Sequence, residues 1–156
     1  MCTVFSLEVA VYAELHCLSN FSFLRGASQP EELVAQARTL NYRALALTDE
    51  CSLAGVVRAH LAAKELDLSL IIGSEFNCID ELKVVALATD RASYGALCRL
   101  ISKARRASPK GSYALSRGDL EGALAGCLVL WLPCADKAAF QRRINQCAEG
   151  GHGTML

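Results

Sequence analysis

Short apolar runs alternate with segments of helical period along most of the chain. Five of these runs have the length and content of buried strands, at residues 11–17, 43–49, 68–76, 82–90 and 127–133. Segments with apolar residues three and four positions apart follow several of them. This alternation is typical of repeated strand–helix units, and it predicts an α/β fold with about five mainly parallel strands and flanking helices.

Capping signals and apolar stripes predict the helices. In the first helix Ser28 is expected as N-cap, with Pro30 in the first turn and Glu31 completing a capping box, and Asn41 is expected to end the helix in a left-handed conformation. This helix is expected to bury the stripe Leu33, Val34, Ala37 and Leu40. The second is expected to bury Leu53, Val56, Val57 and Leu61. A third is expected over 91–107, and a last one over 136–147.

Composition limits the class of protein. The chain has 156 residues, 53% of them hydrophobic, with 16 basic and 16 acidic side chains, which fits one ordinary domain with no overall preference for a polyanion. The eight cysteines form no CxxC pair, so we expect them to be reduced and mostly in the core. The first basic residue is Arg25, and no apolar run reaches about 18 residues. A cytoplasmic protein is expected.

Three polar residues fall at or just beyond the ends of consecutive predicted strands: His16, Asp49 and Glu75. Functional side chains gather at this edge of parallel α/β sheets. One imidazole and two carboxylates suit zinc, manganese or iron, with magnesium less comfortable beside a nitrogen ligand. The alternative is that these residues cap helices or meet solvent. Glu50 is either a further oxygen ligand or an exposed acid in the first turn of the next helix.

Basic residues are concentrated at one place, which contains Arg99, Lys103, Arg105, Arg106 and Lys110 with no acid between them. Such a run can contact nucleic-acid phosphates. It is also what an ordinary helix C-terminus carries, where cations oppose the negative end of the helix dipole. No Walker-type loop, GxSxG or paired CxxC motif is present.

The ordered string carries more information than any single motif. The segments "YAELHCLSNFSFLRGAS", "ALALTDECSLAGVVRAHLAAKE" and "LIIGSEF" closely resemble the start of the bacterial error-prone DNA polymerases of the C family. That start is a PHP (polymerase and histidinol phosphatase) domain, and the resemblance extends over about residues 12–133. It implies a partial PHP-type distorted (βα) barrel.

The resemblance also implies where metal ligands would lie. PHP barrels hold up to three metal ions at their strand ends. The family's H-x-H motif reads His16-Cys17-Leu18 here, its Asp-His pair reads Asp49-Glu50, and its glutamate is kept as Glu75. Since the later ligands are expected beyond this chain, the resemblance implies a degenerate site with no catalytic residue and no cofactor. A residual zinc, manganese or magnesium ion is the alternative.

The expected organisation is an N-terminal extension (1–11), an incomplete PHP domain (12–135) and a divergent C-terminal tail (136–156). The leading hypothesis is a scaffold segment of a damage-tolerant polymerase, without polymerase activity by itself. Its expected partners are the remaining polymerase domains, DNA through the parent polymerase and other mutagenesis or replication proteins, with no membrane. The alternatives are a metal-dependent phosphoesterase and a non-catalytic DNA- or protein-binding module. An open barrel is also expected to make the isolated chain associate.

Overall fold

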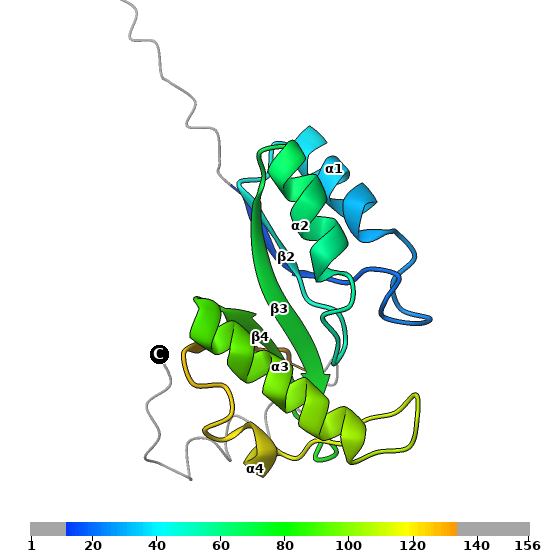
Figure 1. Cartoon of the computed structure of the whole chain (residues 1–156), viewed down its shortest axis with the longest axis vertical. Helices are drawn as coiled ribbons and strands as arrows, with labels where there is room; N and C mark the ends of the chain where they lie inside the picture. The colour runs from blue at the N-terminus through cyan, green and yellow to red at the C-terminus, as the bar shows by residue number, and fades with distance from the viewer. Residues whose placement is uncertain (1–11, 134–156) are drawn as a thin grey trace, which may run out of the picture.

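The structure is a computed structural model that describes residues 12–133. Within this range a single five-stranded sheet curls into half a barrel, with helices packed against it (Figure 1). The strands, in sheet order, are β1 (Ala13–Cys17), β2 (Ala44–Leu47), β3 (Ser69–Asn77), β4 (Lys83–Ala88) and β5 (Cys127–Trp131). The helices are α1 (Pro30–Thr39), α2 (Val56–Glu65), α3 (Arg91–Arg106) and the short α4 (Arg117–Leu120). The predicted α/β class and strand number are confirmed; the extension, the tail and the helix at 136–147 lie outside the described residues.

The sheet is mixed, which corrects the expectation of mainly parallel strands. β1, β2 and β3 pair in parallel, whereas β3–β4 and β4–β5 pair antiparallel. Only five residues connect β3 to β4. A parallel crossover needs about a dozen residues or more, so a connection of this length forces the chain to turn back on itself.

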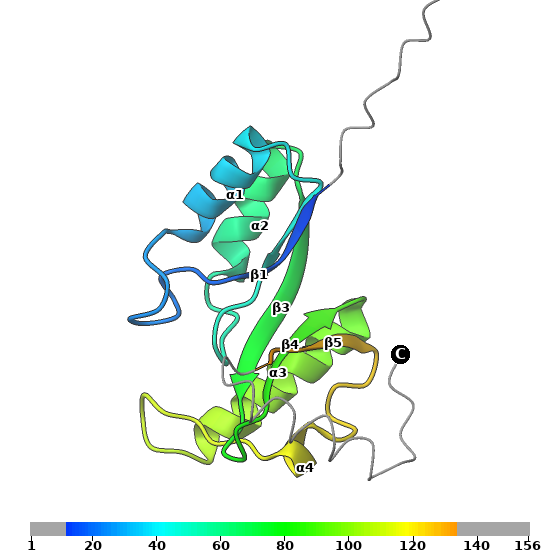
Figure 2. The same ribbon diagram turned by 180° about the vertical axis from the view of Figure 1, so that it is seen from behind.

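The helices pack against one face of the sheet, in two groups that Figures 1 and 2 show from opposite sides. α1 and α2 cover the parallel half through a cluster that includes Val34, Leu47 and Ala59. α3 covers the antiparallel half through Phe76, Leu97 and other buried residues. The opposite face of the sheet holds a smaller apolar cluster around Ala46, Val85 and Leu87. The long strand β3 crosses both halves and joins them.

The helix boundaries agree with the sequence signals only in part. Asn41 does adopt a left-handed conformation, with φ of 57°. The N-cap of α1 is Gln29 and the capping box partner is Glu32, one residue later than expected at each position, because the helix starts with Pro30. None of the helices in the described part of the chain is long and apolar enough to cross a membrane.

The structure confirms the predicted apolar stripe of α2 only in part. Val57 and Leu61 are 68% and 57% exposed, while Ala59 and Ala63 are buried with Val56. α2 lies against α1 through these small side chains, and alanine at such positions lets two helices approach closely. Val57 and Leu61 therefore face outward, while Val56 and the partly buried Leu53 pack inward as expected.

Candidate functional site

The candidate site lies where the parallel strands β1, β2 and β3 end. The backbone of Thr48 donates to the carbonyl of Cys17, and the backbone of Glu75 donates to the carbonyl of Thr48, so the three strand ends stay in register. Glu50 continues the pairing as an isolated parallel bridge to Glu75. Gly73 permits the close approach below the site, because a Cβ there would lie 2.7 Å from the carbonyl oxygen of Ala86.

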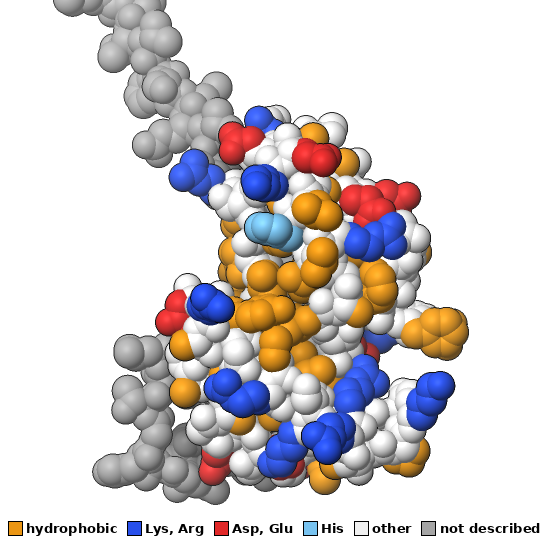
Figure 3. Space-filling model, viewed as in Figure 1, with side chains coloured by type: hydrophobic (Ala, Val, Ile, Leu, Met, Phe, Trp, Pro, Cys, Tyr) orange, Lys and Arg blue, Asp and Glu red, His pale blue; other side chains and the backbone are white. Residues whose placement is uncertain are grey.

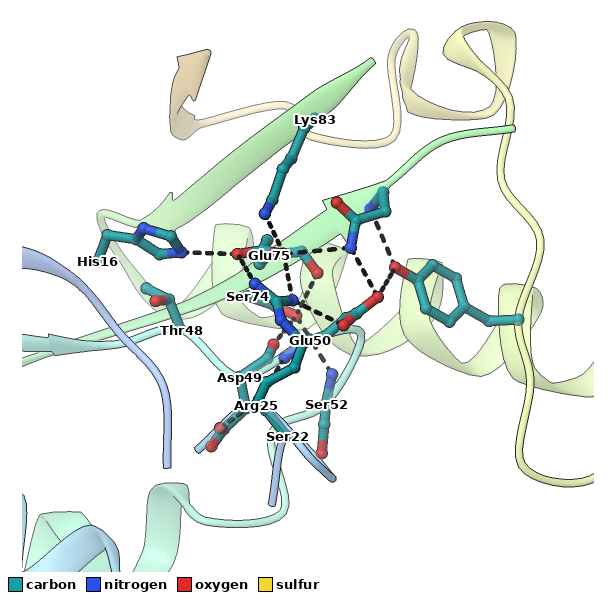
Figure 4. A network of polar contacts seen from close by, with 12 residues as sticks. His16, Ser22, Arg25, Thr48, Asp49, Glu50, Ser52, Ser74, Glu75 and Lys83 are labelled. Carbon is teal, nitrogen blue, oxygen red and sulfur yellow. Dashed lines mark hydrogen bonds and ion pairs between the residues drawn. The ribbon is translucent and has the colours of Figure 1, made fainter. Parts of the chain in front are cut away.

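Glu75 is the centre of a network of charges (Figure 4). Its side chain is fully buried, and its Oε2 lies 2.7 Å from Nε2 of His16. Arg25 binds both of its oxygens, with Nη1 2.5 Å from Oε1 and Nη2 3.1 Å from Oε2. Nζ of Lys83 lies 3.2 Å from Oε1. One buried carboxylate thus has three basic side chains around it.

These neighbours decide the charge of Glu75. Burial alone would raise the pKa of this carboxyl group. The hydrogen bonds from His16 and Arg25, together with the positive charges of Arg25 and Lys83, outweigh burial and hold the pKa of Glu75 well below its usual range. Glu75 is therefore a carboxylate at neutral pH, and the network depends on its negative charge.

Glu50 forms the second half of the network. Its Oε2 accepts from Arg25 at 2.7 Å, and its Oε1 accepts from the Tyr113 hydroxyl at 2.8 Å and from Nδ2 of Asn77 at 2.7 Å. Burial opposes ionisation, but the hydrogen bonds from Arg25, Asn77 and Tyr113 lower the pKa of Glu50. Glu50 is therefore neither a free ligand nor a simple exposed acid, since Arg25 joins it to Glu75.

Asp49 has a different role from the one its position suggested. Its carboxylate is buried and accepts three hydrogen bonds: from the backbone of Ser19 at 2.8 Å, from the Ser19 hydroxyl at 2.7 Å and from the Ser22 hydroxyl at 2.7 Å. It thereby fixes the loop between β1 and α1. The structure brings His16, Glu50 and Glu75 together, while the carboxylate of Asp49 is turned to this loop.

The five predicted nucleic-acid contacts have three different environments. Arg105 points into the molecule, where it donates to the carbonyl oxygens of Cys51 and Glu50 and lies over the ring of Tyr113. These contacts turn Arg105 inward to support the site, and its contact with nucleic acid stays a prediction. Lys103 pairs with Asp119 at 2.8 Å. The others, Arg99, Arg106 and Lys110, are exposed.

Sequence reasoning missed Arg25, Lys83, Asn77 and Tyr113. Arg25, Lys83 and Tyr113 come from elements other than the three parallel strands, so strand order alone gave no reason to group them, and Asn77, which ends β3, lies two residues beyond Glu75. The sequence held one signal for the position of Arg25: it directly precedes Gly26, and a glycine at this point indicates a tightly folded loop. A Cβ on Gly26 would lie 2.0 Å from the carbonyl oxygen of Ser19, which shows how tightly this loop folds back.

The arrangement does not fit a divalent ion. A metal ion needs carboxylate or imidazole lone pairs directed at a common point. Here those of Glu75 and Glu50 are directed at a guanidinium group, and Lys83 adds a further positive charge. Among residues 12–133, no three His, Cys, Asp or Glu side chains lie where they could share a metal ion. As the side chains stand, Arg25 takes the place of a cation.

The sequence matches the PHP domain family over residues 14–144, which is most of the chain. The chain belongs to the PHP domain family. This agrees with the half-barrel and with the position of the polar network at its strand ends.

Curated relatives define the branch of the family more closely. The chain is 65% identical over 132 residues to an error-prone DNA polymerase of Dechloromonas aromatica, with 81% of this chain and 13% of the relative covered. It is 60% identical over 128 residues to an error-prone DNA polymerase of Aromatoleum aromaticum, covering 81% of this chain and 12% of the relative. The chain therefore spans about an eighth of the length of these relatives.

Two solved structures share the fold. One is a protein assigned as a metal-dependent phosphoesterase of Bifidobacterium adolescentis, with a TM-score of 0.53 and 30% identity, covering 63% of this chain and 34% of that one. The other is an amidohydrolase of Chromobacterium violaceum, solved with bound sulfate and no metal, with a TM-score of 0.53 and 27% identity, covering 62% and 34%.

Proposed function

We propose that this chain is the N-terminal PHP region of an error-prone DNA polymerase and that it acts as a structural module without hydrolytic activity of its own. One observation carries this proposal: Arg25 joins Glu50 to Glu75 at the position where a metal-dependent enzyme would need a cation with an open coordination site. The identity of 65% to a polymerase whose N-terminal region it matches supports the first half of the proposal.

A guanidinium cannot replace a metal ion in catalysis. A metal ion in a phosphoesterase lowers the pKa of a bound water and polarises the phosphoryl oxygen. Arg25 neutralises the carboxylates, but it has no vacant coordination position and does not activate water. Leu18, which stands where the family motif has its second histidine, removes a further nitrogen ligand.

The role proposed for the network is to hold the β1–α1 loop and the strand ends in one arrangement. A rigid half-barrel of this kind would support the polymerase domains that follow in the relatives. Under this proposal the partners are those domains, DNA through the parent polymerase, and other mutagenesis or replication proteins. Nucleotidyl transfer across damaged template would belong to the whole polymerase.

Metal analysis with a hydrolysis assay tests the proposal. The purified chain is incubated with zinc or manganese, desalted and analysed for bound metal, and a generic phosphodiester is supplied as substrate. The Bifidobacterium adolescentis protein is the positive control. We expect substoichiometric metal and no hydrolysis above background. Stoichiometric metal together with hydrolysis that His16→Ala abolishes would instead establish the chain as a metal-dependent phosphoesterase.

A further inference from the structure

The outward face of α3 is strongly basic. The helix carries five arginine or lysine side chains and no acidic residue in a chain whose formal net charge is zero. Figure 3 shows blue side chains distributed over α3, in contrast to the mixed charges around α1 and α2. Among the helices of residues 12–133, α3 therefore has the largest excess of positive charge.

Folding accounts for only some of these cations. The inward contacts of Arg105 explain its presence, and Lys103 has Asp119 as a partner. The helix dipole favours cations in the last turn, but its effect falls off within that turn, and Arg99 lies in the helix interior. Arg99 and Arg106 are exposed and form no ion pair with any residue between 12 and 133. Within this range Arg99 therefore has neither an ion pair nor a place in the last turn, whereas Arg106, which ends the helix, is favoured by the dipole.

Three exposed cations of α3 lie in a line, although one of them, Lys103, is paired with Asp119. Arg99, Lys103 and Arg106 follow at spacings of four and three residues, which places them on one helix face within about 10.5 Å along the axis. A shallow groove of about 630 Å³ runs beside them, lined by these three residues together with Cys98, Ser102 and Ala107. The small side chains leave the charged groups accessible from outside.

We propose that this face of α3 binds the phosphate backbone of duplex nucleic acid. Arginine forks match phosphate oxygens, and each duplex strand carries about one charge per 3.4 Å of helix axis, so a line of cations laid along the axis would face about three phosphates. A protein partner would need large apolar anchors, and the groove offers none. A single strand would need an aromatic ring for base stacking, but Tyr94 lies about 140° around the helix from Arg99.

A binding assay with a matched control tests this. Fluorescence anisotropy of a labelled 20-bp duplex is measured at low salt with the complete chain, with Arg99→Glu/Arg106→Glu and with Arg38→Glu/Lys64→Glu. Arg38 and Lys64 are exposed in the last turns of α1 and α2, so both double variants change the net charge equally. The unchanged chain is expected to bind with a Kd in the range of about 10⁻⁴ to 10⁻⁶ M.

The α3 variant is expected to bind at least about tenfold more weakly, and the control less than about twofold. The slope of log K against log salt should fall by about 1.8 in the α3 variant, since two phosphate contacts are lost at about 0.9 each. Equal losses in both variants, or equal affinity for polyglutamate, would overturn the proposal, and so would no binding by the unchanged chain. Circular dichroism establishes that each variant is folded. The outcome does not depend on whether the PHP region is a structural module, because the metal and hydrolysis assays do not involve α3.

Discussion

Removing the guanidinium of Arg25 is the most direct test of how the site is held together. Arg25→Met keeps an apolar stem of similar kind but removes the charge and all the donors. Two hydrogen bonds to Glu75 and one to Glu50 are lost. Glu75, which is fully buried, then keeps its negative charge with fewer partners, or takes up a proton at a cost in free energy.

The magnitude follows from burial. Breaking a buried ion pair by removing one partner costs about 3–5 kcal/mol. The Arg25 side chain is 31% exposed, and His16 and Lys83 still contact Glu75 in the variant, so part of the cost is relieved. We expect a loss of about 2–4 kcal/mol in the free energy of unfolding. That is a large share of the roughly 5–15 kcal/mol typical of a folded domain.

Urea unfolding followed by circular dichroism measures this loss. Arg58→Met is the matched control, because Arg58 pairs with Glu31 on the surface, where the two side chains are 47% and 39% exposed. The control is expected to lose less than about 1 kcal/mol. In a double-mutant cycle with Glu75→Gln, the two losses should be less than additive, since the buried charge is already gone. Equal losses for Arg25→Met and Arg58→Met, or strict additivity in the cycle, would refute the reasoning.

Three further predictions concern the same scaffold. The pKa of Glu75 is lowered in the folded chain from its ordinary 4.5, so its contribution to stability is present above pH 4.5 and is lost as the pH falls below 4.5. Between about pH 6 and 3 the free energy of unfolding should therefore drop more steeply in the unchanged chain than in Glu75→Gln. Equal slopes would contradict this prediction. Asp49→Ala removes three hydrogen bonds from the β1–α1 loop, so it should lower the free energy of unfolding by about 3 kcal/mol. The loosened loop should also be cleaved faster by trypsin after Arg25, and an unchanged cleavage rate would argue against the proposed role of Asp49. Gly73→Ala should cost about 2–3 kcal/mol in urea unfolding, because its Cβ would lie 2.7 Å from a backbone oxygen. The control Gly118→Ala, whose Cβ would lie 3.8 Å from the Ser116 hydroxyl, should change the free energy of unfolding by less than about 1 kcal/mol.

The strands were predictable because a buried strand leaves a local signature. Each of the five apolar runs contains the observed strand within a few residues. Strand direction has no such signature, since an apolar run looks the same in both orientations. The short connection between residues 77 and 83 was the one available signal for the antiparallel half, because too few residues remain there for a crossover. On α2 the larger apolar residue Val57 was expected to be buried, but the close packing of α2 against α1 buries the smaller Ala59 and leaves Val57 exposed.

The site was predictable in position but not in its contacts. Strand ends correctly placed His16 and Glu75 next to each other. The partner that determines their charge state, Arg25, comes from a loop whose path depends on the hydrogen bonds of Asp49, and no spacing rule connects the two. The contacts of the basic run could not be predicted either. Arg105 and Arg106 are neighbours in the sequence and nothing near them distinguishes the two, yet only Arg105 turns inward.

A divalent ion and a guanidinium solve the same structural problem in different ways. Both neutralise carboxylates at a strand end where burial would otherwise favour protonation. Only the metal ion keeps a position open for water, and hydrolysis needs that position. Arg25 therefore explains how Glu75 stays buried and ionised. On this reasoning, retained carboxylates in a PHP sequence do not by themselves indicate hydrolysis, since a neighbouring arginine can account for them.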